Sequence, residues 1–275
     1  MNLRQWRWNF SSRARELSGG DVIIVSIPKS GRTWVRTFLC AYFCERNGHL
    51  FTLEPEKYGG IPRVIFSHDR FEQRTKADLW DRLRGKYLIA ANELKRLPII
   101  LLVRDPRDAF VSLYVQLVRR TPETSHALRQ KSASDLLRDR YFGLRSIVKT
   151  MNGWLREFSA RSDFALVRYE SLHAAPEENF RHLLAAIGES LADDVAFSHA
   201  LAFSAFENMK KLEAAGAFDS KILRPGNARD PESFKVRRGK VGGYIDYLEE
   251  ADMAYVAEVM RELDPRFGYE RNIES

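Results

Sequence analysis

The sequence predicts an α/β fold in which a single central parallel sheet carries helices on both faces. Two apolar runs of strand length, residues 22–25 and 99–103, each lead almost directly into a segment with helical spacing. Strand and helix patterns then alternate along the chain, as they do in β-α-β units. No internal repeat, low-complexity tract or Pro/Gly-rich linker interrupts the 275 residues. We therefore expect one domain, residues 21–275, preceded by an N-terminal arm, residues 1–20.

Each expected element has local start and stop signals. The first strand, residues 21–26, lies between Gly20 and Pro28. Helical spacing begins near Trp34 and ends at Gly48, a residue type that is favoured just after a helix. The further elements are expected, in chain order, at residues 63–68 (strand), 97–104 (strand), 105–120 (helix, with Asp105 as N-cap and Pro106 at its first position), 134–158 (helix), 163–170 (strand) and 175–188 (helix).

Composition limits the functional classes. The net charge of +7 and the pI of about 9.4 fit either an acidic partner or a solvated basic surface. The basic residues are scattered along the chain, so we do not expect nucleic acid as a partner. Cys40 and Cys44 are one helical turn apart and are expected to be core thiols in a reducing compartment. No signal peptide and no apolar run long enough to span a membrane are visible, so we expect a cytoplasmic protein.

The stretch VIIVSIPKSGRTWVRTF, residues 22–38, predicts an anion site. A buried strand ends in a short loop that holds Lys29 and Gly31, and a helix begins directly after it. The loop does not match the nucleoside triphosphate motif G-x-x-x-x-G-K-[ST], because Lys29 precedes the only glycine of the loop. In a parallel sheet, ligands bind at the carboxyl ends of the strands, which is where this loop lies. A P-loop-like nucleotide-binding core is the resulting prediction.

Residues 27–34, IPKSGRTW, resemble the Y-P-K-S-G-T-T-W loop of sulfotransferases that use 3′-phosphoadenosine 5′-phosphosulfate (PAPS) and release 3′-phosphoadenosine 5′-phosphate (PAP). Six of the eight positions match. The resemblance implies that Lys29 contacts the phosphosulfate and that Trp34 stacks near the adenine. It also implies that Ser30, Gly31 and Thr33 bind the 5′-phosphate, together with the loop amides. Arg32 stands where the family has Thr, and its backbone N–H still fits the site.

Three further segments resemble the same family. LLVRDPRDAFVS implies that Arg104 and Ser112 bind the 3′-phosphate. An ion pair between Arg104 and Asp105 or Asp108 is the alternative interpretation. VRRGKVGGYIDYL, residues 236–248, implies the same role for Arg237, Arg238 and Gly239, although Gly243 and Tyr244 replace the usual Asp and Trp. Tyr169 matches the family's adenine-side tyrosine, and residues 203–213 resemble its S-F-E-x-M-K stretch.

The chemistry that the resemblance implies is sulfuryl transfer by in-line displacement. His68 ends the strand RVIFSH and matches the family's K-T-H segment, whose histidine is the general base. Lys29 would stabilise the leaving phosphate oxygen, and Ser112 would restrain Lys29 until the acceptor arrives. Phe66 replaces a lysine that helps to hold the sulfate in relatives, so Lys29 or Arg32 would have to take over that function. No metal ion is required in this scheme.

Two other functions remain as alternatives. A nucleotide or small-molecule kinase shares the strand–loop–helix arrangement, and a non-catalytic nucleotide-binding protein would also keep the anion site. The acceptor is expected to offer a hydroxyl or an amine on a small molecule, a lipid or a carbohydrate. The sequence does not predict which acceptor is used, nor the oligomeric state.

Overall fold

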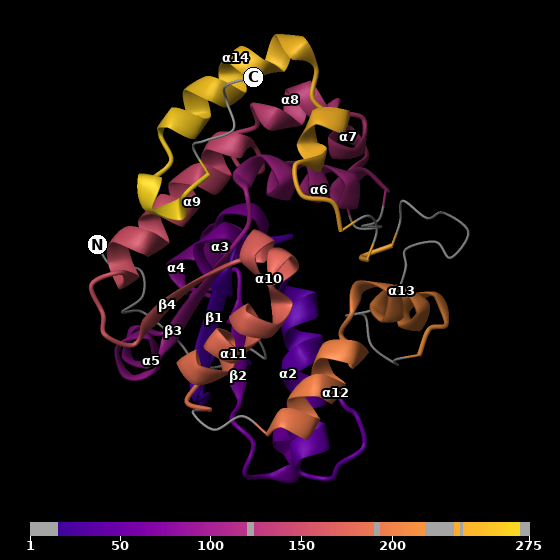
Figure 1. The fold of residues 1–275 in the computed structure, drawn as a ribbon. Coiled ribbons are helices and arrows are strands. Elements are labelled where there is room, and N and C mark those ends of the chain that lie inside the picture. Colours follow the sequence, from indigo (N-terminus) through magenta and orange to yellow (C-terminus); the bar gives the residue numbers. More distant parts are fainter. Residues whose placement is uncertain (1–15, 120–123, 190–192, 218–233, 237–238, 270–275) are drawn as a thin grey trace.

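A computed structural model describes residues 16–119, 124–189, 193–217, 234–236 and 239–269. Its centre is a sheet of four parallel strands in the order β2-β1-β3-β4 (Figure 1). The strands are β1 (Val22–Ser26), β2 (Val64–Ser67), β3 (Ile99–Val103) and β4 (Phe164–Arg168). The predicted parallel sheet is confirmed, and each strand lies inside its predicted range.

Helices cover both faces of the sheet, as predicted. Alternate residues of a strand point to opposite faces. Ile23 and Val25 of β1 therefore belong to a core cluster with α6 (Pro106–Arg119), α9 (Leu144–Phe158) and α14 (Glu250–Arg261). Val22 and Ile24 belong to a second cluster with α2 (Arg32–Arg46), α11 (Pro176–Ala186) and α12 (Asp194–Phe203). The remaining helices are α3 (Asp69–Lys76), α4 (Leu79–Leu83), α5 (Ala91–Arg96), α7 (His126–Arg129), α8 (Ala133–Leu137), α10 (Tyr169–Ala174) and α13 (Phe206–Ala214), with short 3-10 turns at Pro55–Tyr58, Gly243–Asp246 and Pro265–Phe267.

The predicted helix over residues 134–158 is wrong in one respect, because it is two helices. Helix α8 ends at Leu137 and α9 begins at Leu144. Between them the Asp139 carboxylate accepts hydrogen bonds from the backbone N–H groups of Tyr141 and Phe142, at 2.8 and 3.1 Å. Aspartate commonly stabilises turns through such local bonds, which compete with the helical pattern.

Helix α2 begins close to its predicted start and ends at the predicted stop. Gly48, just beyond its end, has a φ of +67°. Cys40 and Cys44 are both buried in this helix as free thiols, which confirms the prediction that they are core residues. Burial raises the pKa of the Cys40 thiol to about 12. Within the described residues, no helix combines the length and the apolar character needed to cross a bilayer.

The register of the sheet places three polar loops side by side at the carboxyl ends of the strands. Val25 pairs with Ser67, and Ser26 pairs with Leu102, so β1, β2 and β3 end at nearly the same level. The residues that follow these ends include Lys29, His68 and Arg104. Parallel strands thus bring side chains from three distant parts of the chain to one site.

Candidate active site

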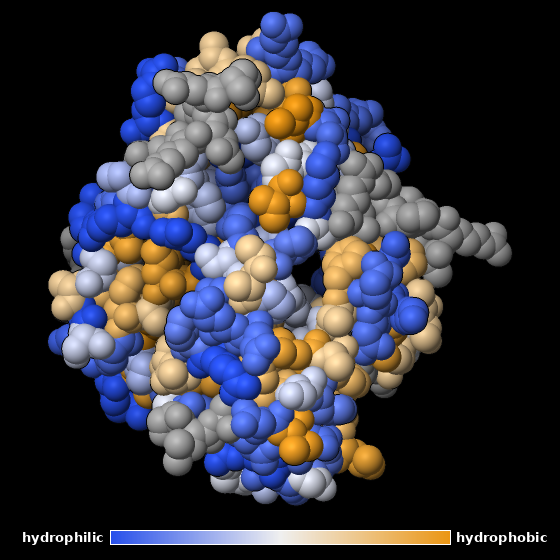
Figure 2. Space-filling model, in the orientation of Figure 1, coloured by the Kyte–Doolittle hydropathy of each residue, from blue (hydrophilic) through white to orange (hydrophobic). Residues whose placement is uncertain are grey.

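A cavity of about 890 Å³ lies at the carboxyl ends of the strands. On the face drawn in Figure 2, a small opening lies beside α13. Most of the residues that the sequence analysis assigned to the site line this cavity, namely Lys29, Gly31, Arg32, Thr33, Trp34, His68, Arg104, Ser112, Tyr169 and Gly239. Ser30, in the loop between β1 and α2, is fully buried. Arg237 and Arg238 lie outside the described residues.

The loop before α2 is shaped for close approach by an anion. Gly31 has a φ of +86°, and a Cβ atom at this position would lie 2.7 Å from Cδ2 of Tyr169. Only glycine fits both constraints without strain. The Ser30 hydroxyl is buried and has no hydrogen-bond partner among the described residues. It is therefore a polar group that a phosphate oxygen could satisfy.

Trp34, Tyr169 and Arg104 form an aromatic and cationic wall of the cavity. The rings of Trp34 and Tyr169 meet edge to face at 5.8 Å. The Arg104 guanidinium lies over the Tyr169 ring, 4.5 Å from its centroid. Burial raises the pKa of the Tyr169 hydroxyl, so this ring stays neutral. The wall offers flat surfaces suited to a purine next to a fixed positive charge.

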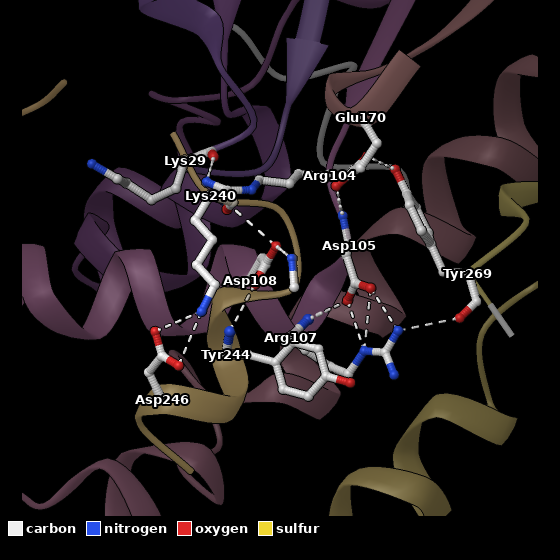
Figure 3. Close-up of polar contacts among 11 residues, drawn as sticks. Lys29, Arg104, Asp105, Arg107, Asp108, Glu170, Lys240, Tyr244, Asp246 and Tyr269 are labelled. Carbon is white, nitrogen blue, oxygen red and sulfur yellow. Dashed lines mark hydrogen bonds and ion pairs between the residues drawn. The ribbon is translucent and has the colours of Figure 1, made fainter. Parts of the chain in front are cut away.

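Arg104 connects three segments at this wall (Figure 3). Its guanidinium donates to the backbone carbonyls of Lys29 and Lys240, at 3.4 and 3.0 Å. It also forms an ion pair with Asp108 at 3.6 Å, as in the alternative interpretation of the sequence. The Arg104 Nε group is buried without a hydrogen-bond partner among the described residues. Arg104 therefore both forms the ion pair and keeps a donor for a ligand.

Asp108 anchors the segment that follows Gly239. Its carboxylate accepts hydrogen bonds from the backbone N–H groups of Gly242 and Tyr244, at 2.8 and 2.9 Å (Figure 3). Burial raises the pKa of Asp108, and the charge of Arg104 is the largest opposing influence. The Tyr244 ring is buried under the Arg107 guanidinium, 4.6 Å from its centroid. This departure from the family motif therefore has a structural role beside the site.

Helix α13 holds the same segment from the other side. Phe206 packs so closely on Gly239 that a Cβ atom there would lie 2.7 Å from the ring. The fully buried Glu213 carboxylate accepts hydrogen bonds from the backbone N–H groups of Lys235 and Val236, at 2.7 and 2.9 Å. These contacts fix the described residues on both sides of the predicted basic pair.

His68 has a defined tautomer. Its Nδ1 atom lies 2.7 Å from the backbone carbonyl oxygen of Ser26. Because a carbonyl only accepts, Nδ1 carries the hydrogen, and Nε2 is the basic nitrogen of the neutral ring. Burial and the positive charge of Arg32 hold the pKa of His68 well below its ordinary value. The ring is therefore neutral and able to accept a proton near pH 7.

Charged groups surround His68 at the other end of the cavity. Glu72 lies one turn after His68 along α3, and its charge partly counters the effect of Arg32 on the histidine pKa. Its carboxylate is only 8% exposed and forms an ion pair with the more exposed Lys76 at 2.7 Å. All three charged side chains line the cavity.

The structure adds detail on two positions that the sequence analysis discussed, the restraint of Lys29 and the replacement of a lysine by Phe66. Lys29 has a φ of +73°, and its Nζ atom donates to Oε1 of Gln116 at 3.2 Å. Gln116 lies one helical turn beyond Ser112, the residue that the sequence analysis expected to restrain Lys29, and that role of Ser112 stays a prediction. Phe66 packs against the second core cluster under the guanidinium of Arg36, and it is not among the cavity-lining residues. Arg32 lines the cavity, whereas position 66 does not.

No group of three or more His, Cys, Asp or Glu side chains among the described residues is placed to hold a metal ion. The acidic groups near Arg104 are engaged elsewhere. Asp105 caps α6 by accepting from the backbone N–H of Arg107 at 2.9 Å, as the sequence predicted. The Glu170 carboxylate accepts from the backbone N–H of Asp105 and from the Tyr269 hydroxyl, at 2.9 and 2.7 Å.

Comparison with known proteins identifies the family. The sulfotransferase domain model matches residues 19–268. The chain belongs to the sulfotransferase domain family. Members of this family transfer a sulfuryl group from PAPS, so the predicted enzyme class is confirmed.

The sulfotransferase resembles cytosolic members of the family at a distance. It is 26% identical over 281 residues to sulfotransferase 2B1 of Rattus norvegicus, a match that covers 92% of this chain and 74% of the relative. It is 25% identical over 253 residues to cytosolic sulfotransferase 14 of Arabidopsis thaliana, with 83% and 70% covered.

Solved structures with the same fold include mouse sulfotransferase SULT7A1 complexed with PAP, at 20% identity and a TM-score of 0.58. That match covers 93% of this chain and 90% of the mouse chain. Retinol dehydratase in a complex with retinol and PAP has a TM-score of 0.57 at 16% identity, with 88% and 80% covered.

Several residues of the site were missed by the sequence analysis. Gln116, Glu72 and Lys76 line the cavity, and Glu213 accepts from the backbone of two residues that line it. Asp108 also lines it, and the sequence analysis named it only as a possible ion-pair partner of Arg104. Gln116 could have been found, because it lies four residues after Ser112 and so shares its helix face. Glu72 lies four residues after His68, and Lys76 lies four residues after Glu72, so the same spacing relates them. Glu213 had no such signal, because its partners are more than 20 residues away in the chain.

Proposed function

We propose that this sulfotransferase moves the sulfuryl group of PAPS onto a hydroxyl, or an amine, of a small-molecule acceptor, with His68 as general base. The observation that carries the proposal is the hydrogen bond from His68 Nδ1 to the Ser26 carbonyl. It leaves Nε2 as the proton acceptor on a ring that lines the cavity. The low pKa of the imidazole keeps it in the neutral form that the step requires.

The residues present fit a PAPS nucleotide. The buried Ser30 hydroxyl and the Arg104 Nε group each lack a partner among the described residues, and so does the cavity-lining Ser204 hydroxyl. Phosphate oxygens would satisfy the donors at Ser30 and Arg104, and the backbone N–H groups at the start of α2 would add to them. Trp34 and Tyr169 would hold the adenine against their aromatic wall. The resemblance assigns the 3′-phosphate to Arg104, Ser112 and the segment around Gly239.

The chain's own residues then divide the chemistry. PAPS supplies an activated sulfuryl group whose leaving group is a phosphate. Lys29 would neutralise the negative charge that grows on the leaving oxygen, and Gln116 and Ser112 would orient its ammonium. His68 Nε2 would take the proton of the acceptor while Arg32 stabilises the equatorial sulfate oxygens. Positioning and charge stabilisation account for the catalysis, as in phosphoryl transfer.

The acceptor half of the cavity supports a small molecule with both apolar and polar parts. Phe71, Leu113 and Phe142 give it apolar walls, whereas Glu72 and Lys76 place charges beside them. Solved relatives with this fold hold retinol or androsterone together with PAP. We infer that the acceptor here is a small molecule that presents a polar group close to the reacting hydroxyl.

A ligand-binding test distinguishes the proposed sulfotransferase activity from that of a kinase and from a non-catalytic nucleotide-binding protein. The thermal unfolding midpoint should rise with PAP and not with ATP·Mg²⁺. Saturation at a hundred times the dissociation constant adds about 2.7 kcal/mol, or about 5 °C for a chain of this size. PAP formation from PAPS should then be screened over a panel of phenols, amines and sugars, in wild type and in His68→Asn. Binding of PAP without any transfer to the panel would favour the non-catalytic alternative, and stabilisation by ATP·Mg²⁺ alone would favour the kinase.

A further inference from the structure

Asp69, the residue directly after His68, has an uncommon combination of features. It is fully buried, and its φ is +39°, in the left-handed region. Among residues other than glycine, Asp and Asn reach this region most readily. Such a conformation persists only where the surrounding structure holds it in place, and residues of this kind cluster at functional sites.

Three hydrogen bonds hold Asp69 in this conformation. Its backbone N–H donates to the Ser67 hydroxyl at 2.9 Å. Its carboxylate accepts from the backbone N–H of Ile89 at 3.1 Å and from the indole Nε1–H of Trp154 at 3.2 Å. Both donors belong to fully buried residues, one after α4 and one on α9. The junction between β2 and α3 is thus tied to two elements that are distant in the chain.

The position of Asp69 has a direct consequence for His68. The two residues share a peptide bond, so fixing Asp69 also fixes the direction in which the His68 side chain leaves the backbone. The ring itself is held through Nδ1 by Ser26 on β1, whose carbonyl oxygen lies at 2.7 Å and whose hydroxyl lies at 3.3 Å. A rotation of the His68 backbone would move Nδ1 away from that carbonyl.

We propose that Asp69 is a positioning residue, whose carboxylate keeps the His68 imidazole in the Nδ1–H tautomer with Nε2 available to the acceptor. This inference rests on the proposed function of His68. A purely structural Asp69 would stabilise the fold without affecting the tautomer. The two roles can therefore be separated by measuring the tautomer directly.

The experiment uses three variants of the full chain. Asp69→Gly keeps the backbone conformation accessible but removes both acceptors. Asp69→Asn also tolerates positive φ, but one end of its amide is a donor and cannot accept. Trp154→Phe removes one of the two donors and leaves Asp69 unchanged, so it tests the same contact if the Asp69 variants do not fold.

The readout is the two-bond ¹H–¹⁵N correlation of the His68 ring at pH 8, where the lowered pKa keeps this ring neutral. His68→Asn assigns the signal. We expect the Nδ1–H tautomer in wild type and a shift toward Nε2–H in all three variants, with PAP affinity changed by less than about twofold. Asp252→Asn serves as the control, because Asp252 is also a buried carboxylate with two partners that are distant in the chain, Ser134 of α8 and Arg138 directly after α8. It should lower the unfolding midpoint without altering the His68 signal.

Variants that are destabilised like Asp252→Asn but keep the Nδ1–H tautomer would overturn the inference. The proposed function fails on a different measurement. If His68→Asn keeps full PAP-forming activity, His68 is not the base, whatever the tautomer shows. If that variant is inactive and the tautomer does not respond to Asp69 or Trp154, only the positioning role is refuted.

Discussion

Substitution of Gly31 by alanine tests the shape of the nucleotide loop. The left-handed conformation at φ +86° costs an alanine about 1–2 kcal/mol. The new Cβ atom would also lie 2.7 Å from Cδ2 of Tyr169. Relieving such a close contact in a packed region typically costs about 1–3 kcal/mol. The expected loss of stability is therefore about 2–5 kcal/mol. With an unfolding entropy of about 2.1 cal/mol/K per residue, this lowers the midpoint by about 4–9 °C.

Gly48→Ala is the matched control for this substitution. Gly48 has a φ of +67° and nothing within 4 Å of its ideal Cβ position, so it carries the conformational cost alone. Differential scanning fluorimetry should show a larger loss in Gly31→Ala than in Gly48→Ala. The stabilisation by PAP should also be reduced in Gly31→Ala only, because Tyr169 must move. Equal losses with unchanged PAP stabilisation in both variants would refute the close packing of Tyr169 on the loop.

Three other predictions concern charge. Removing the positive charge in Arg32→Gln should raise the pKa of His68 and move the acid limb of kcat/KM to higher pH. Glu72→Gln should lower that pKa and move the limb to lower pH. Identical pH profiles would show that neither charge acts on the base. Arg104→Gln should weaken PAP binding about 10- to 100-fold in calorimetry, because a charged hydrogen bond contributes about 1.5–3 kcal/mol. Arg104→Lys should recover part of the affinity. Unchanged affinity in Arg104→Gln would show that Arg104 does not bind the nucleotide. Glu213→Gln should lower the unfolding midpoint by about 3–5 °C, because the amide keeps one acceptor oxygen and loses one charged hydrogen bond to a backbone N–H group. A midpoint equal to that of wild type would contradict those contacts.

The sheet and the nucleotide loop were predictable because their signals are local. An apolar run that ends in Pro28 and Lys29 specifies both a buried strand and the loop after it. The split of the expected helix over residues 134–158 was not predictable from periodicity, because apolar residues continue at helical spacing through the break. The decision depends on Asp139, whose side chain bonds to two nearby N–H groups in preference to the helical pattern.

The parts of the site that the sequence analysis missed depend on contacts between distant segments. The resemblance predicts that His68 is the base, but the tautomer of His68 depends on a carbonyl 42 residues away on a neighbouring strand. Likewise, nothing near Asp108 in the sequence indicates that it accepts from the backbone of residues 242 and 244. The pairing of β1 with β2 brings His68 beside Ser26, and the packing of residues 242–244 against α6 brings their backbone to Asp108.

The pairing of Arg104 with Asp108 explains how the proposed site for a polyanion stays folded without one. A buried guanidinium with no counter-charge would cost several kcal/mol, so the free protein needs a carboxylate at this point. Yet a tight bidentate pair would compete with the ligand's phosphate. The observed pair is long, at 3.6 Å, because Asp108 directs its two oxygens to the backbone N–H groups of Gly242 and Tyr244. The carboxylate thus balances the charge of Arg104, keeps the segment after Gly239 in place, and leaves the Nε–H of Arg104 for a phosphate oxygen.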